Sequence, residues 1–140
     1  MSFHEKSAWV MALALLLGGM FYFAALVSAS SGLGRLAAPV LPPLLVLTIG
    51  LAVLSIIGHV AIAVMAPRDA NTPPDEREWK IFHRAGYLAW YVSVTGVILS
   101  LGLYLFTDDG NLLFYCVLAS LMLSQMVEYV LQIVFHRTSV

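Results

Sequence analysis

The stretch Ser120–Arg137 reads SLMLSQMVEYVLQIVFHR, and it places one glutamate, Glu128, among mostly apolar side chains. It belongs to a longer run, because Glu128 is the only formally charged residue between Gly110 and His136. About 20 apolar residues are enough to cross the hydrocarbon core of a bilayer as a helix. The stretch therefore predicts a membrane-spanning helix that carries a carboxylate inside the membrane.

The rest of the chain shows the same pattern. Residues 7–34, 36–67 and 85–107 contain no Asp, Glu, Lys or Arg. The chain is 61% hydrophobic and 11% charged, whereas soluble domains have about 25% charged residues. Because lipid offers the backbone no hydrogen-bond partner and these runs do not alternate, we expect helices rather than strands. We predict an all-α fold, an integral membrane four-helix bundle forming a single domain over residues 1–140, with helices at about 7–29, 41–66, 82–106 and 112–136.

Lysine and arginine residues are unevenly distributed over the expected loops. One side of the predicted arrangement receives Arg35 alone, and the other receives the remaining cations: Lys6, Arg68, Arg77, Lys80, Arg84 and Arg137. Cation-rich loops and termini stay in the cytoplasm. We therefore expect both termini and the loop 67–81 to be cytoplasmic, which is an N-in/C-in topology.

Small residues mark the expected contacts between helices. In the third helix they recur at three- and four-residue spacing: Ala89, Ser93, Gly96 and Ser100. Gly18 and Gly19 are adjacent in the first helix. Small side chains allow the backbones of two membrane helices to approach closely. We expect these positions to lie at helix–helix interfaces.

Polar residues recur every four positions in the last helix: Ser120, Ser124, Glu128, Gln132 and His136. This spacing places them along one stripe of the helix surface. A charge at the bilayer centre is unfavourable by about 2.5–3.5 kcal/mol on insertion scales. We therefore expect the stripe to face protein or water rather than lipid.

The partner expected for Glu128 is His59. Each residue lies nine positions before an arginine, Arg137 and Arg68 respectively, which is about 13.5 Å along a helix. At equal depth, the two side chains are expected to lie within hydrogen-bond reach, directly or through one water. The residues predicted to bind a ligand or a proton are Glu128, His59, Gln125, Gln132, Ser124 and Ser55.

Two functions are compatible with this pair of residues. A structural polar clamp indicates a non-enzymatic binding or regulatory membrane module. A titrating Glu128 indicates a small proton-coupled transporter, which in so short a chain would favour a homodimer with the site near its interface. No HExxH motif, glycine-rich phosphate loop or plausible catalytic triad is present. We therefore expect no enzymatic activity.

Three histidines, His4, His83 and His136, fall near the expected cytoplasmic ends of the helices. They could converge on a metal ion with Glu5 nearby, but solvated histidines at the membrane surface are the simpler interpretation. A haem held by two histidines would need a second histidine at the depth of His59, and the sequence has none there. We predict neither a metal nor a cofactor.

The loop before the third helix carries the sequence DEREWKIFHRAG, residues 75–86. It resembles the DERE-x-x-I-x-x-R-A-G pattern of small, uncharacterised bacterial inner-membrane proteins. The resemblance implies a multi-pass protein of the bacterial inner membrane. Asp75 and Glu78 also have the spacing of a capping box at a helix start. The expected partner is the lipid bilayer, and no nucleic acid is expected. A second copy of the chain and a cytoplasmic protein at loop 67–81 are further candidates, but a solvated helix start that anchors at the headgroups through Trp79 and the cations is the simpler interpretation of the loop.

The charge distribution makes the topology testable. Reporter domains fused after Ala70 and at the C-terminus should both report a cytoplasmic location, because the cations are concentrated on that side. A reporter fused after Arg35 is the control and should report the opposite side. A periplasmic signal from either of the first two fusions would contradict the N-in/C-in topology.

Overall fold

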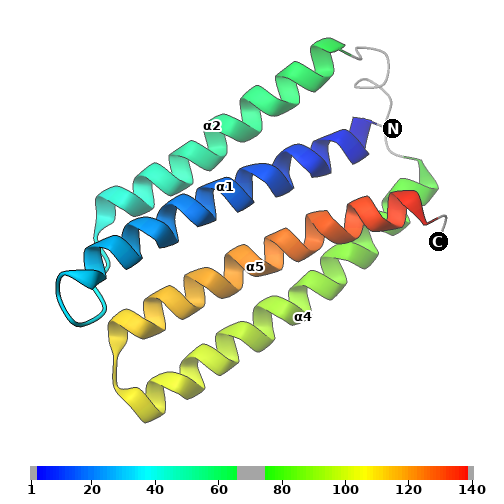
Figure 1. Ribbon diagram of the computed structural model, residues 1–140. Coiled ribbons are helices and arrows are strands. Elements are labelled where there is room, and N and C mark those ends of the chain that lie inside the picture. Colours follow the sequence, from blue (N-terminus) through cyan, green and yellow to red (C-terminus); the bar gives the residue numbers. More distant parts are fainter. Residues whose placement is uncertain (1–2, 66–74, 139–140) are drawn as a thin grey trace.

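The computed structural model describes residues 3–65 and 75–138, and these fold into four helices (Figure 1). The helices are α1 (Phe3–Ser31), α2 (Leu41–Met65), α4 (Glu76–Thr107) and α5 (Gly110–Arg137). No strand occurs in these ranges. Each helix is long and apolar enough to cross a membrane. The all-α class and the four predicted helices are confirmed. Arg68 and the part of the predicted loop 67–81 before Asp75 lie outside the described residues.

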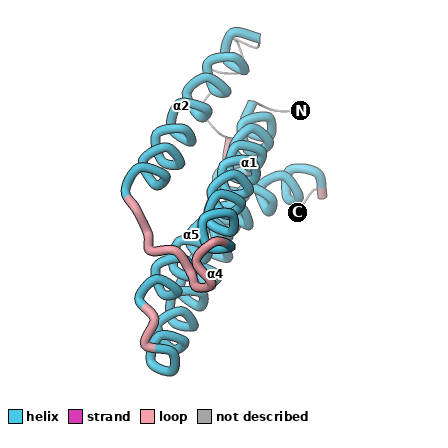
Figure 2. Tube along the Cα trace, turned by 60° about the vertical axis from the view of Figure 1, so that its left-hand side comes forward, coloured by secondary structure: helices cyan, strands magenta, loops and turns pink. Residues whose placement is uncertain are grey.

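The helices form two antiparallel hairpins, α1 with α2 and α4 with α5, which are joined by contact between α1 and α5. Figure 1 shows the resulting order across the molecule, α2, α1, α5 and α4. The start of α1, the end of α2, the start of α4 and the end of α5 lie together, and we call this the charged end. The connections from α1 to α2 and from α4 to α5 form the opposite, turn end. Figure 2 shows α2 standing apart from the α4–α5 hairpin.

Side-chain caps decide where the second hairpin begins and turns. α4 starts at residue 76 rather than at about 82, because Asp75 Oδ1 accepts a hydrogen bond from the Glu78 amide at 2.7 Å. The other half of the predicted capping box is not formed in the described residues, since the Glu78 side chain faces two histidines instead. At the turn end, Asp108 takes the left-handed conformation (φ 51°). Asp109 Oδ1 then caps α5 by accepting hydrogen bonds from the amides of Asn111 and Leu112, at 2.9 and 3.1 Å.

The most extensive helix contact joins α4 to α5. A Cβ atom added to Gly96 would lie 2.6 Å from the Ser120 hydroxyl, so only glycine fits opposite that serine. The Ser124 hydroxyl donates to the Ala89 carbonyl at 2.8 Å. Ala89 and Ser100 are both buried. The predicted close contact of the third helix is therefore confirmed at Ala89, Gly96 and Ser100.

α1 lies in the middle and contacts both of its neighbours. The predicted role of its glycine pair is confirmed, because Gly18 faces Leu47 and Leu51 of α2 while Gly19 faces Met122 of α5. Two clusters of buried side chains extend these contacts. Towards the charged end, α1 and α5 share the cluster Ala8, Ala12 and Ile133, and towards the turn end α1, α2 and α5 share Tyr22, Leu47 and Tyr115.

The fit at Gly96 predicts a localised effect of side-chain size. Gly96→Leu should lower the free energy of unfolding by about 1–3 kcal/mol, because the new side chain overlaps Ser120 across the interface. Gly102→Leu on the same helix is the matched control, since a Cβ atom there has no neighbour within 4 Å. Thermal or denaturant unfolding in detergent would measure both. Equal effects of the two changes would contradict the close α4–α5 contact.

Candidate functional site

The polar stripe of α5 faces its neighbouring helices. Ser124 and Gln132 are buried and Glu128 is half-buried. Gln125, which lies beside the stripe, is exposed. The expectation that the stripe faces protein is confirmed for Ser124, Glu128 and Gln132, whereas Gln125 lies on a different face and does not join them.

Glu128 faces α4 across Gly86. A Cβ atom on Gly86 would lie 3.9 Å from Glu128 Oε1, in van der Waals contact with the carboxylate. Gln132 Nε2 donates to the same oxygen at 3.3 Å. Within the described residues this is the only hydrogen bond to the Glu128 carboxylate. Both partners belong to α5, so Glu128 makes no hydrogen-bonded link to another helix in the part of the chain that is described.

His59 joins α2 to α1. Its Nδ1 lies 2.7 Å from the Ser55 carbonyl oxygen, which can only accept, so Nδ1 carries the hydrogen. Its Nε2 lies 2.6 Å from the Ser7 hydroxyl and therefore accepts from it. Both ring nitrogens of a neutral imidazole are satisfied by this arrangement.

The direct hydrogen bond predicted between Glu128 and His59 is not formed. His59 contacts Ser7 and Ser55, and Glu128 contacts Gln132. The physical reason is the order of the helices, because α1 lies between α2 and α5 (Figure 1). Equal depth fixes the position of a residue along its helix but not the helix that it faces. Sequence reasoning missed Ser7, and the only signal for it was a small hydroxyl at the start of an apolar run.

A second group of polar residues lies at the charged end. Glu5 of α1 is buried, and its Oε1 accepts from Arg137 Nε of α5 at 3.2 Å. The Arg137 guanidinium also lies over the Trp9 ring, 5.5 Å from its centroid. This pair connects the first turn of α1 to the last turn of α5.

Glu78 of α4 lies between two histidines, one from α1 and one from α5. His4 Nε2 is 3.6 Å from Glu78 Oε2, and His136 Nε2 is 3.9 Å from Glu78 Oε1. The Phe82 ring packs beside both, with ring centroids 5.3 Å from His4 and 6.4 Å from His136. We call His4, Glu78 and His136 the His–Glu–His cluster. It brings together α1, α4 and α5.

The third histidine of the charged end, His83, does not join this cluster. It is exposed, and its Nδ1 donates to the Trp79 carbonyl at 2.9 Å. Glu5, which was expected near the histidines, is paired with Arg137. Residues 3–65 and 75–138 contain no group of three or more His, Cys, Asp or Glu side chains placed to hold a metal ion. The arrangement of the cluster is therefore that of a carboxylate flanked by two imidazoles.

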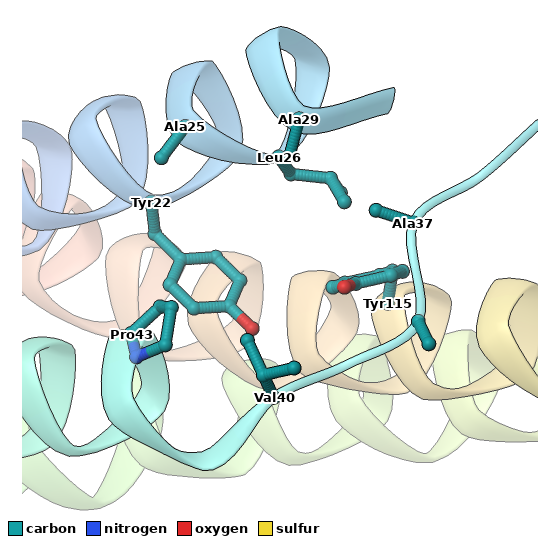
Figure 3. A pocket seen from close by; sticks show the side chains of 9 residues that line it. Tyr22, Ala25, Leu26, Ala29, Ala37, Val40, Pro43 and Tyr115 are labelled. Atoms are coloured by element: carbon teal, nitrogen blue, oxygen red, sulfur yellow. The ribbon is translucent and has the colours of Figure 1, made fainter. Parts of the chain in front are cut away.

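A small cavity lies far from both polar groups, at the turn end. Its volume is about 80 Å³, and Figure 3 shows the rings of Tyr22 and Tyr115 beside it. The remaining lining is apolar: Ala25, Leu26, Ala29, Ala37, Ala38, Val40 and Pro43. No predicted site residue lines it. Its size and lining suit apolar packing rather than chemistry.

The two observed hydrogen-bond sets predict different energetic couplings. A double-mutant cycle of Ser7→Ala and His59→Ala should give a coupling energy of about 0.6–2 kcal/mol, the range for hydrogen bonds between membrane helices. The same cycle with Glu128→Ala and His59→Ala should give about zero. Unfolding in detergent or lipid measures both. A larger coupling for the second pair would mean that Glu128 and His59 are in contact after all.

Comparisons with protein-family models, with curated proteins and with solved structures find no match. The resemblance of residues 75–86 to the DERE pattern therefore stays a prediction. The function has to be argued from the contacts of the chain itself.

Proposed function

We propose that the chain is a non-enzymatic binding or regulatory module of the bacterial inner membrane, with both termini in the cytoplasm. The observation that carries this proposal is that interior polar groups are used to join helices. Ser7 with His59 links α1 to α2, and Ser124 with the Ala89 carbonyl links α5 to α4. Hydrogen bonds of this kind hold membrane helices in register. These links serve architecture, and binding is assigned to the charged end.

The proposed binding surface is the first part of α4. Glu76, Arg77, Trp79 and Lys80 are exposed there, and they combine both signs of charge with a large aromatic side chain. The Asp75 cap holds this segment in helical form. Tryptophan and arginine side chains are enriched where proteins bind one another, so Trp79 and Arg77 are the residues of this surface that favour binding. We propose a cytoplasmic protein as the partner at this surface.

A paired substitution tests the surface. Glu76→Ala with Arg77→Ala should change the free energy of unfolding by less than about 0.5 kcal/mol, because both side chains are exposed. Chemical crosslinking in native membranes, read by mass spectrometry, should lose the protein partner. Arg35→Ala, an exposed cation at the turn end, is the matched control and should keep it. A crosslinked partner retained by the paired variant would contradict the proposed surface.

The second candidate function is a small proton-coupled transporter in which Glu128 titrates, working as a homodimer. One observation favours it. The Glu128 carboxylate is half-buried and accepts a single hydrogen bond of 3.3 Å within the described residues. An approaching cation or second hydrogen-bond donor would change the surroundings of this carboxylate, as a proton-coupled site requires.

Glu128→Gln separates the two candidates, because glutamine keeps the shape but cannot titrate. For the proposed module, the variant should fold with a loss of about 1 kcal/mol or less. Proteoliposomes containing a pH-sensitive dye, under a potassium diffusion potential, should then show the same proton leak for wild type and variant. Proton entry in the wild type that the variant lacks would instead establish the transporter.

A further inference from the structure

The ring of His136 is buried at the charged end. Its Nδ1 lies 2.7 Å from the Gln132 carbonyl oxygen, an atom that can only accept. Nδ1 therefore carries a hydrogen. In a neutral imidazole with that tautomer, Nε2 has a lone pair and no hydrogen.

That Nε2 atom is buried and has no hydrogen-bond partner among the described residues. The His136 side chain is 8% exposed, and Glu78 Oε1 lies 3.9 Å from its Nε2. Two acceptors, a ring lone pair and a carboxylate oxygen, thus face each other. A buried polar atom without a partner is unfavourable. One added proton turns this repulsion into an attraction between imidazolium and carboxylate, and a shift that shortens the 3.9 Å distance makes it a charge-assisted hydrogen bond.

We propose that His136 binds a proton at Nε2 and that the Glu78 carboxylate holds it there. The bond formed is N–H on the imidazole, and the carboxylate keeps its negative charge. The resulting ion pair connects the last turn of α5 to the first turn of α4. His4 of α1 lies 3.6 Å from the other carboxylate oxygen and is the third member of the site.

The other charged groups near His136 do not replace Glu78 as the charge that faces its Nε2. On α4, Arg77 donates to the His136 carbonyl oxygen at 3.4 Å, and its charge opposes proton uptake. Glu5 of α1 and Arg137 of α5 pair with each other at 3.2 Å, so their charges largely cancel. The Glu78 carboxylate is therefore the charge that faces Nε2. The Phe82 ring packs beside both histidines.

Two other histidines, His59 and His83, make the same bond from Nδ1 to a carbonyl oxygen but differ from His136 in burial or in the partner of Nε2. His59 has the same Nδ1-to-carbonyl bond, but its Nε2 already accepts from the Ser7 hydroxyl. His83 also has that bond, to Trp79, but its ring is exposed. Among the described histidines with that bond, His136 alone combines a buried, unpartnered Nε2 with a facing carboxylate.

Nitrogen-15 NMR of the histidine-labelled protein tests the proposal, and the chain has only 4 histidines to assign. Spectra are recorded from about pH 8 to about pH 5, the range over which histidine side chains change charge. In the wild type, His136 should pass from the Nδ1–H form to the doubly protonated ring. In Glu78→Gln, the ratio of protonated to neutral His136 at a given pH should fall about tenfold or more, because the carboxylate is gone.

Two controls separate this site from a general effect of charge. Glu76→Gln removes an exposed carboxylate from the same turn of α4 and should leave the His136 ratio unchanged. The ring signals of His83 should be the same in the wild type and both variants at each pH. An unchanged His136 ratio in Glu78→Gln, or a neutral ring protonated at Nε2, would overturn the proposal.

A second measurement needs no variant and applies if Glu78→Gln does not fold. The dipolar coupling between His136 Nε2 and the Glu78 carboxyl carbon should be stronger at about pH 5 than at about pH 8. Equal coupling at both would overturn the proposal. The site rests on contacts of the charged end and not on the partner proposed above, so it stands or falls separately from the docking surface on α4.

Discussion

The close approach of α4 and α5 at Gly96 and Ser120 is the contact on which the rest of the structure depends. Lipid tails are as apolar as leucine, so helices in a membrane associate through packing and hydrogen bonds rather than through burial of apolar surface. Glycine opposite serine lets the two backbones approach, and the bond from Ser124 to the Ala89 carbonyl fixes their register. With that register set, Glu128 comes to lie against Gly86.

The central position of α1 divides the polar residues into separate groups. On one side, Ser7 satisfies His59 of α2, and on the other, Ala8 and Ala12 pack against Ile133 of α5. A neutral histidine with both nitrogens bonded has no further donor or acceptor to offer. Glu128 is left with its own helix, where Gln132 is its hydrogen-bond donor. A functional site made from both residues would require α1 to move, and the chemistry that remains concentrates at the charged end.

The sequence was sufficient to predict the helices and the small residues at their interfaces, because charge-free runs and small residues at helical spacing have direct physical consequences. The helix start at Asp75 was visible as a cap, although the boundary was set too late. The partner of His59 was not predictable from depth, since depth says nothing about which helix lies alongside. Likewise, the spacing of Glu78 predicted a reciprocal cap, whereas the fold brings His4 and His136 to its side chain. Contacts between residues this far apart depend on the order of the helices, which no local pattern encodes.

The first turn of α4 connects the two proposals physically. Glu78 turns inward to the His–Glu–His cluster, while Arg77 and Glu76, one and two residues away, are exposed on the proposed binding surface. A proton on His136 holds this turn against α5 by attraction between opposite charges. A partner that prefers the turn in that position must strengthen proton binding by the same factor by which the proton strengthens partner binding, because linkage is reciprocal. The short helical segment between surface and cluster is thus the element through which acidity at the charged end and partner binding would influence each other.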